Sequence, residues 1–354
     1  MTKILIIILL LITFIIIIAM GVGIIKKQTT DTTLYNTQYS GLEGYKKVNT
    51  NTPCKNKKYM NNINYQLLYS KARGNSAIVV DFLNYTDAKK IFDEFSTCNY
   101  MTPCEIKTKL GFPESLATWT KKRNQWIDLC LTHYSDCILN FTMSEQQQIY
   151  DLFIDNPFIK YDAINFKLAF IKINGKFDWN YPFTIGYNNI VLPEELIQKI
   201  KYGVMTKKEF GILINHEITH ILQRRNQSKY NKLYNDIGYI IVPRNQIITS
   251  INTVTNPDDD PEGVLLFKIN EKDYIYTTLA YDVRLLANSP SPMCLLMHKR
   301  ADGKYIQMGY WLMDSNPSLP YLNLMKKAWE KIYPDITLDK ITYSPNEIMA
   351  GMEE

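Results

Sequence analysis

One segment of the chain combines a helix start, a helical apolar pattern and two histidines. Residues 206–226 read TKKEFGILINHEITHILQRRN. Thr206 and Glu209 have the T-x-x-E spacing of a capping box, which begins a helix. Apolar side chains cover most of the helix, so it has to pack inside a folded domain. His216 and His220 then lie one turn apart on one face, with about 6 Å between their Cβ atoms.

Two imidazoles at this spacing can bind one zinc ion at about 2.0–2.1 Å each. Glu217 lies about 100° round the helix from His216, where its carboxylate reaches a water on the metal rather than the metal itself. The alternative is an amphipathic helix whose histidines only pack. That alternative leaves a glutamate on a buried face without a partner, which is costly. The sequence therefore predicts Zn²⁺ at His216 and His220, with Glu217 as general base.

The pattern His216-Glu217-x-x-His220 resembles the active-site helix of the zincin (HExxH) zinc metallopeptidases. The resemblance covers residues 160–354. It implies an endopeptidase in which zinc activates water and polarises the scissile carbonyl, while Glu217 moves the proton to the leaving amine. It also implies that residues 183–192 form an edge strand that pairs with an extended peptide or protein substrate.

A longer signature joins this motif to two later segments. Gln223-Arg224 follows the motif, and residues 256–258 and 345–350 read NPD and PNEIMA. This set is similar to a little-characterised group of HExxH proteins from large DNA viruses and protists. A composition rich in Ile, Asn, Lys and Tyr fits the AT-rich genomes of such organisms. We expect Gln223 and Arg224 to fix the helix end or to orient a ligand.

A catalytic zinc ion needs a third protein ligand and an open position for water. The resemblance implies, as in the gluzincins, a glutamate on a later helix, and Glu347 is the candidate, although its distance in sequence from His220 exceeds the usual interval. Ser344-Pro345-Asn346-Glu347 is also a capping box, which offers the same carboxylate a structural role. The alternative ligands are Asp258, Asp259, Asp260, Glu262 and His298.

The tetrahedral oxyanion of peptide hydrolysis needs a second donor besides zinc. The sequence offers several hydroxyl and guanidinium groups in its C-terminal half and does not choose among them. The candidates are Tyr281, Arg284 and Tyr310.

An uncharged apolar run occupies residues 4–25. As a helix it would span about 33 Å, enough for a hydrocarbon core of about 30 Å. We therefore expect residues 1–27 to form a single-pass transmembrane anchor, with a cleaved signal peptide as the alternative. Lysines on both sides of the run leave the orientation of the body open.

The remaining chain divides by composition. Residues 28–58 read as a linker rich in Thr, Asn, Lys, Tyr and Gly, and residues 59–157 as a Cys-rich, mainly helical accessory domain. Residues 158–354 then form a zincin-like domain with a small mixed sheet and the active-site helix, so the expected fold class is α+β. Six cysteines allow three disulfides, whose pairing the sequence does not give.

Local signals predict several boundaries. Thr86 is expected to cap one helix, and Ser144 with Gln147 forms an S-x-x-Q capping box for another. Asn174-Gly175 is a hairpin signal after the β-rich residues 166–173. A second hairpin is expected around residues 270–273.

Charge and composition limit the function. Forty Lys and Arg against 35 Asp and Glu give a net charge of +5, too small an excess over 354 residues to predict nucleic-acid binding. We therefore expect a membrane-anchored zinc endopeptidase with a peptide or protein substrate and no nucleic-acid partner. The alternatives are a non-enzymatic viral envelope or surface protein that keeps a zincin scaffold for binding, and an anchored adhesion protein with a chance HExxH.

Overall fold

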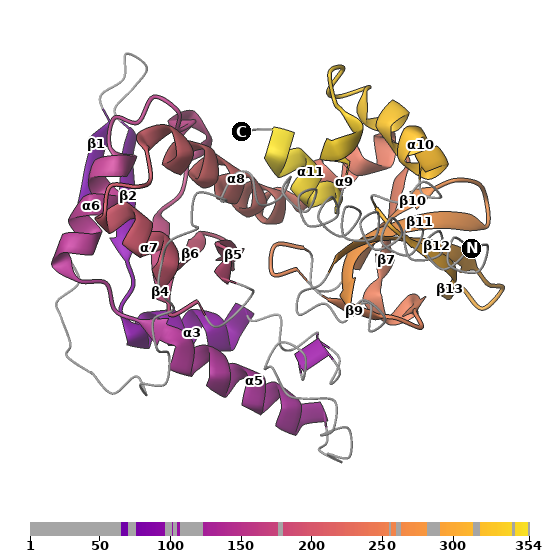
Figure 1. Ribbon diagram of the computed structural model, residues 1–354, viewed down its shortest axis with the longest axis horizontal. Helices are drawn as coiled ribbons and strands as arrows, with labels where there is room; N and C mark the ends of the chain where they lie inside the picture. The colour runs from indigo at the N-terminus through magenta and orange to yellow at the C-terminus, as the bar shows by residue number, and fades with distance from the viewer. Residues whose placement is uncertain are drawn as a thin grey trace, which may run out of the picture. The chain divides into compact units, whose positions relative to one another are not determined.

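The chain divides into two compact units, Met1–Lys55 and Asn56–Glu354, and the computed structural model describes residues of the second unit only. The described residues are 65–69, 76–95, 101, 105–106, 123–175, 180–254, 256–259, 263–281, 291–313, 319–341 and 344–352. They form an α+β structure built on two sheets, each covered by helices (Figure 1).

The first sheet has the strand order β1-β2-β4-β6-β5, and β3 pairs with β4. Strands β2, β4 and β6 run parallel, whereas β1 and β5 are antiparallel to their neighbours. Every residue of β4 is buried because strands flank it on both sides and helices cover both faces of the sheet. The strands are β1 (Tyr65–Tyr69), β2 (Ser76–Phe82), β3 (Ile138–Leu139), β4 (Leu168–Ile173), β5 (Phe183–Ile185) and β6 (Asn189–Pro193).

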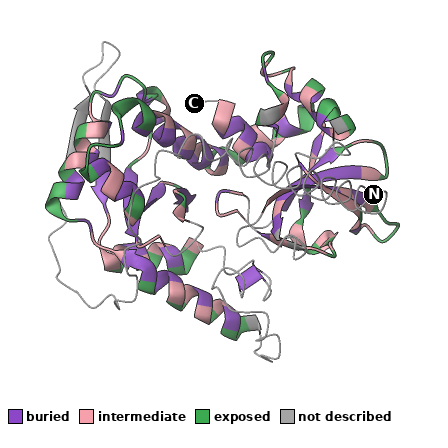
Figure 2. Cartoon of the chain, viewed as in Figure 1, coloured by how far each residue is buried: buried purple, intermediate pink, exposed green. Residues whose placement is uncertain are grey.

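Helices cover both faces of this sheet, and the alternation of side chains along β4 and β6 divides the core in two. Phe170 and Ile190 pack with three helices, α6 (Met143–Phe153), α7 (Glu194–Lys201) and α8 (Lys207–Arg225). Ile171 and Val191 point the other way, toward α3 (Tyr85–Phe95) and α5 (Arg123–Cys137). Figure 2 shows the resulting band of buried residues in the strands and along α8.

The second sheet has the order β7-β10-β11-β12-β13-β8, and β9 pairs with β11. Its pairs are antiparallel except β13 with β8. A short 3-10 turn, Arg244–Gln246, joins β7 to β8, the two ends of the strand order, so the sheet bends into a nearly closed barrel. The strands are β7 (Tyr239–Pro243), β8 (Ile247–Ile248), β9 (Asn252–Val254), β10 (Gly263–Lys268), β11 (Asp273–Tyr281), β12 (Ser291–Lys299) and β13 (Tyr305–Leu312).

Three helices pack on one face of the second sheet. They are α9 (Gln227–Asp236), α10 (Leu319–Trp329) and α11 (Pro345–Met352). Trp329 is fully buried, and its indole N–H donates to the Tyr239 hydroxyl at 3.0 Å. The last helix, α11, also contacts α8 of the first sheet, which brings two distant parts of the sequence together (Figure 1).

The expected fold with an N-terminal transmembrane helix is corrected by the structure. Within the described part of the chain, no helix has both the length and the apolar character that a membrane span needs. The expected anchor, residues 1–27, and the linker, residues 28–58, lie outside the described residues. Among the described residues, nothing supports the membrane location that was derived from that anchor.

The described part of residues 59–157 contains the three helices α3, α5 and α6, as expected, but it also contributes the strands β1, β2 and β3. Strands β1 and β2 belong to the same sheet as β4 and β6, so the sheet crosses the boundary expected at residue 158. The second, seven-stranded sheet was not expected. Among the described cysteines Cys130 is disulfide-bonded, whereas Cys137 and Cys294 are not in disulfides, so the six cysteines do not form three disulfides.

Two local predictions for the first sheet fail, and one for the second is confirmed. Asn174-Gly175 does not form a hairpin, because β4 is a central strand that pairs in parallel with β6. Residues 183–192 form two strands, β5 and β6, instead of one, with a turn at Gly186, whose φ is 65°. The expected hairpin around residues 270–273 joins β10 to β11.

The helix caps in the first half lie at other residues than predicted. Asn84 caps α3, since its Oδ1 accepts from the Asp87 N–H at 3.0 Å. Helix α6 begins with a capping box of Thr142 and Glu145, not of Ser144 and Gln147.

Replacing the two candidate cap residues of α6 tests this assignment. We expect Thr142→Ala to lower the free energy of unfolding by about 1 kcal/mol, because the first turn loses an acceptor. Ser144→Ala is the matched control and should change it by less than about 0.5 kcal/mol. Urea unfolding followed by circular dichroism measures both, and a larger cost for the Ser144 variant would contradict the assignment.

Candidate metal centre

Helix α8 begins where the sequence predicts. The Glu209 N–H donates to Thr206 Oγ1 at 3.2 Å, and the Thr206 N–H donates to Glu209 Oε2 at 2.8 Å, which completes the capping box. The hydrogen bonds from Thr206 lower the pKa of Glu209. Phe210 and Ile214 pack this helix into the core of the first sheet. The predicted helix start is therefore confirmed.

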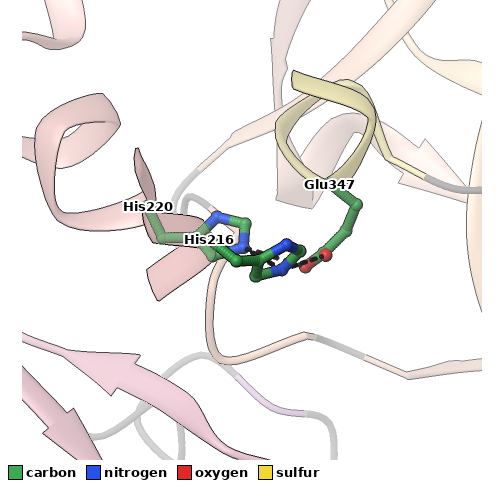
Figure 3. Close-up of side chains that lie close together, drawn as sticks. All are labelled: His216, His220 and Glu347. Atoms are coloured by element: carbon green, nitrogen blue, oxygen red, sulfur yellow. Dashed lines mark hydrogen bonds and ion pairs between the residues drawn. The ribbon is translucent and has the colours of Figure 1, made fainter. Parts of the chain in front are cut away.

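The structure brings His216, His220 and Glu347 together at one point (Figure 3). The two histidine Nε2 atoms lie 3.1 Å apart. Glu347 Oε2 lies 3.2 Å from Nε2 of His216, and Oε1 lies 3.5 Å from Nε2 of His220. Two ligand atoms of a tetrahedral zinc ion are separated by about 3.3 Å, so each of these three contacts is close to the spacing within such a ligand set.

The group is enclosed on one side and open on the other. The side chain of His220 is fully buried, whereas those of His216 and Glu347 are 22% and 14% exposed. Three protein ligands with an accessible face match a catalytic zinc site, whereas structural sites are closed by a fourth protein ligand. The donor set of two imidazoles and one carboxylate also suits zinc.

Glu347 lies in the first turn of α11, where two roles compete for its carboxylate. Its backbone N–H lies 3.4 Å from Ser344 Oγ, which is the weak remnant of a helix cap. The carboxylate itself faces the two histidines, and Asn256 Nδ2 donates to its Oε1 at 2.5 Å. Burial raises the pKa of Glu347, but the facing His220 and the hydrogen bond with His216 hold it well below its usual range.

Glu217 lies beside this group with an incompletely bonded carboxyl. It is 3% exposed, and its Oε2 atom finds no hydrogen-bond partner among the described residues. Burial and the nearby Asp258 raise its pKa to about 8, despite the opposite effect of His216 and His220. Buried polar atoms are almost always hydrogen-bonded, so this oxygen indicates a site for a further group. The residues present therefore fit a zinc ion and a water molecule.

Gln223 and Arg224 continue the polar face of α8. Gln223 Oε1 lies 2.9 Å from Nδ1 of His220, so Gln223 contacts a candidate ligand directly. Arg224 instead binds the edge strand, where its Nε donates to the Gly186 carbonyl at 2.9 Å and its Nη2 to Thr184 Oγ1.

Strand β5 lies at the edge of the first sheet, but one backbone group in it and one just after it are already bonded to other elements. The Thr184 N–H donates to Asp258 Oδ1 at 2.8 Å, and Arg224 holds the Gly186 carbonyl. The segment 256–259 thus occupies the edge at these positions. Sequence reasoning considers the aspartates of this segment only as alternative ligands and misses Asn256 as a partner of Glu347, although NPDD stands out in the sequence.

The alternative ligands are held elsewhere. Asp258 bonds Thr184, and Asp259 accepts a hydrogen bond from the Ser344 hydroxyl at 2.7 Å. His298 lies on the second sheet and pairs at 2.8 Å with an aspartate of β11. Two further candidates lie outside the described residues, Asp260 and Glu262.

Of the three candidate oxyanion donors, the structure describes the side chain of Tyr310 only. Tyr310 lies on β13 and packs against the core of the second sheet. The Tyr281 side chain and Arg284 lie outside the described residues.

Comparison with protein-family models, curated proteins and solved structures finds no match for this chain. An inference about function therefore rests on the geometry of the site and on the HExxH resemblance.

Removing single side chains tests the ligand set. We expect the full chain to bind about one zinc ion, and His220→Ala or Glu347→Ala to weaken binding by more than about 100-fold, since each removes a direct ligand. His298→Ala is the control, because this imidazole also pairs with a carboxylate but lies on the other sheet. Competition with a chromophoric chelator measures the affinities. Unchanged binding in Glu347→Ala would exclude this glutamate as the third ligand.

Proposed function

We propose that this protein is a zinc-dependent endopeptidase, with His216, His220 and Glu347 as metal ligands and Glu217 as general base. One observation carries the proposal. The three ligand atoms lie within 4.8 Å of one another, and the unbonded carboxyl oxygen of Glu217 is buried beside them. The HExxH pattern accounts for the two histidines and Glu217 only. The third ligand has to come from a distant part of the chain, and in this proposal it is Glu347 on α11.

Zinc in such a site supplies Lewis acidity, which lowers the pKa of water and polarises a carbonyl group. Glu217 takes a proton from the attacking water at its free Oε2 and passes it to the amine that leaves. A pKa raised to about 8 before metal binds suits a group that must both accept and release a proton near neutral pH. Nearby positive charge favours the ionised form and moves that pKa downward.

The access to the site limits how a substrate can bind. The exposed parts of His216 and Glu347 form the open side, so the scissile bond approaches there. The proposal does not include pairing of a substrate with the outer edge of β5 at Thr184 and Gly186. Asp258 already accepts from the Thr184 N–H, and Arg224 already donates to the Gly186 carbonyl.

Replacing the general base separates chemistry from metal binding. We expect Glu217→Gln to lower kcat/KM on a fluorogenic peptide library by about 100-fold to 10,000-fold, while zinc content stays at that of the wild type. Glu209→Gln is a matched control, since this carboxylate lies on the same helix but at its exposed start. It should leave kcat/KM within about threefold, because it alters a cap and not the site.

Two possible results of the same assay would contradict the proposal. Hydrolysis that survives Glu217→Gln would exclude Glu217 as the base. A wild-type chain that binds zinc and cleaves no peptide would favour the alternative, a zincin scaffold retained for binding.

A further inference from the structure

We infer that Gln223 is a positioning residue of the metal centre, and that its side-chain amide sets the tautomer of His220 and connects this histidine to the helix that carries Glu347. The inference rests on the proposed zinc function. Gln223 lies three residues after His220 on α8, so both side chains are on one face of the helix. Both are buried, with exposed fractions of 5% and 0%.

The orientation of the Gln223 amide follows from a backbone carbonyl. Gln223 Nε2 lies 3.0 Å from the carbonyl oxygen of Asn346. A carbonyl oxygen only accepts hydrogen bonds, so the NH₂ end of the amide must face it. The reverse orientation would place two acceptor oxygens in contact. The carbonyl end of the amide therefore faces His220, where Oε1 lies 2.9 Å from Nδ1.

This orientation fixes the proton on His220. An amide oxygen only accepts, so Nδ1 of His220 must carry the hydrogen. In a neutral imidazole the other nitrogen then keeps its lone pair. That nitrogen, Nε2, is the atom that faces Nε2 of His216 and Oε1 of Glu347. The chain thus presents His220 in the one neutral tautomer that can bind zinc through Nε2.

The donor end of the same amide anchors the third ligand. Asn346 immediately precedes Glu347 in the first turn of α11, so the bond to its carbonyl holds the backbone that places Glu347. Gln223 Nε2 also lies 3.3 Å from the Tyr234 hydroxyl, which donates to Asn346 Oδ1 at 2.8 Å. Tyr234 and Asn346 are 2% and 8% exposed, so bulk water does not readily replace a lost bond.

Three variants of the full chain separate positioning from stability. Gln223→Leu removes the contacts with His220, Asn346 and Tyr234, and we expect the dissociation constant for Zn²⁺ to rise by about 10-fold to 100-fold. Gln223→Glu keeps an acceptor for Nδ1 of His220 but loses the donor to Asn346, so its loss of affinity should be intermediate, at less than about tenfold. Tyr234→Phe removes a buried hydroxyl from the network while leaving the Gln223–His220 bond in place. It should lower the melting temperature but change the dissociation constant by less than about twofold.

Chelator competition gives the dissociation constants and thermal unfolding gives the melting temperatures. Wild-type affinity in Gln223→Leu would overturn the inference, and so would an equal loss of affinity in Tyr234→Phe, since both would show that the network only stabilises the fold.

A measurement on the metal-free wild type needs no variant, so it does not depend on whether the variants fold. The chain has four histidines, which makes the ¹⁵N spectrum of histidine-labelled protein simple to assign. We expect the neutral form of His220 to carry its proton on Nδ1, and a proton on Nε2 would overturn the inference. Neither readout depends on hydrolysis. A chain that binds zinc through an oriented His220 but cleaves no peptide would contradict the proposed function alone.

Discussion

The interaction on which the structure depends is the burial of a polar stripe on helix α8. Five of its polar residues are buried, and each needs a partner within the protein because water does not reach it. Asn215 accepts from the backbone of Lys160 at 2.9 Å and donates to the carbonyl of Phe158 at 2.6 Å, so it ties the helix to the segment after α6. The stripe consists of Asn215, Glu217, Thr219, His220 and Gln223. A helix of this kind is stable only when other elements converge on it with complementary groups.

The partners of His220 and Gln223 outside α8 come from the C-terminal part of the chain. Helix α11 brings the carbonyl of Asn346 and the carboxylate of Glu347, and the segment 256–259 brings Asn256 and two aspartates. Asp258 also faces the half-buried Arg224, with 3.9 Å between its Oδ1 and the Nη1 of Arg224. Burial lowers the pKa of that guanidinium, and the nearby Asp258 opposes the effect. The second sheet thus serves the site chiefly by presenting one short segment and one helix end to α8.

The sequence predicts the features of the site that lie within one helix. It predicts few of the contacts that residues from different elements make. The cap of α8 and the placement of two histidines with a glutamate follow from spacing within one helix. Asn256, Tyr234 and Asn346 are partners chosen by tertiary structure, and no spacing rule connects them to His220. The misplaced cap of α6 has the same cause. Two capping boxes overlap in TMSEQQ, and Glu145 is selected because its Oε1 also accepts from the buried Lys172 at 2.9 Å.

The two carboxyl groups of the site are pushed in opposite directions by their surroundings. Glu347 faces two imidazoles, which hold its pKa well below its usual range, whereas burial and the nearby Asp258 raise the pKa of Glu217 to about 8. Paired carboxyls with separated pKa values commonly divide their roles, one remaining ionised while the other carries a proton. An ionised Glu347 suits metal binding, and a Glu217 able to hold a proton suits transfer to a leaving group. The unbonded oxygen of Glu217 costs stability in the metal-free chain, and an arriving cation with its water would offset that cost. The cost of leaving this one oxygen without a hydrogen bond is therefore an argument for chemistry at the site. A helix selected only for packing would have an apolar residue in place of the buried glutamate.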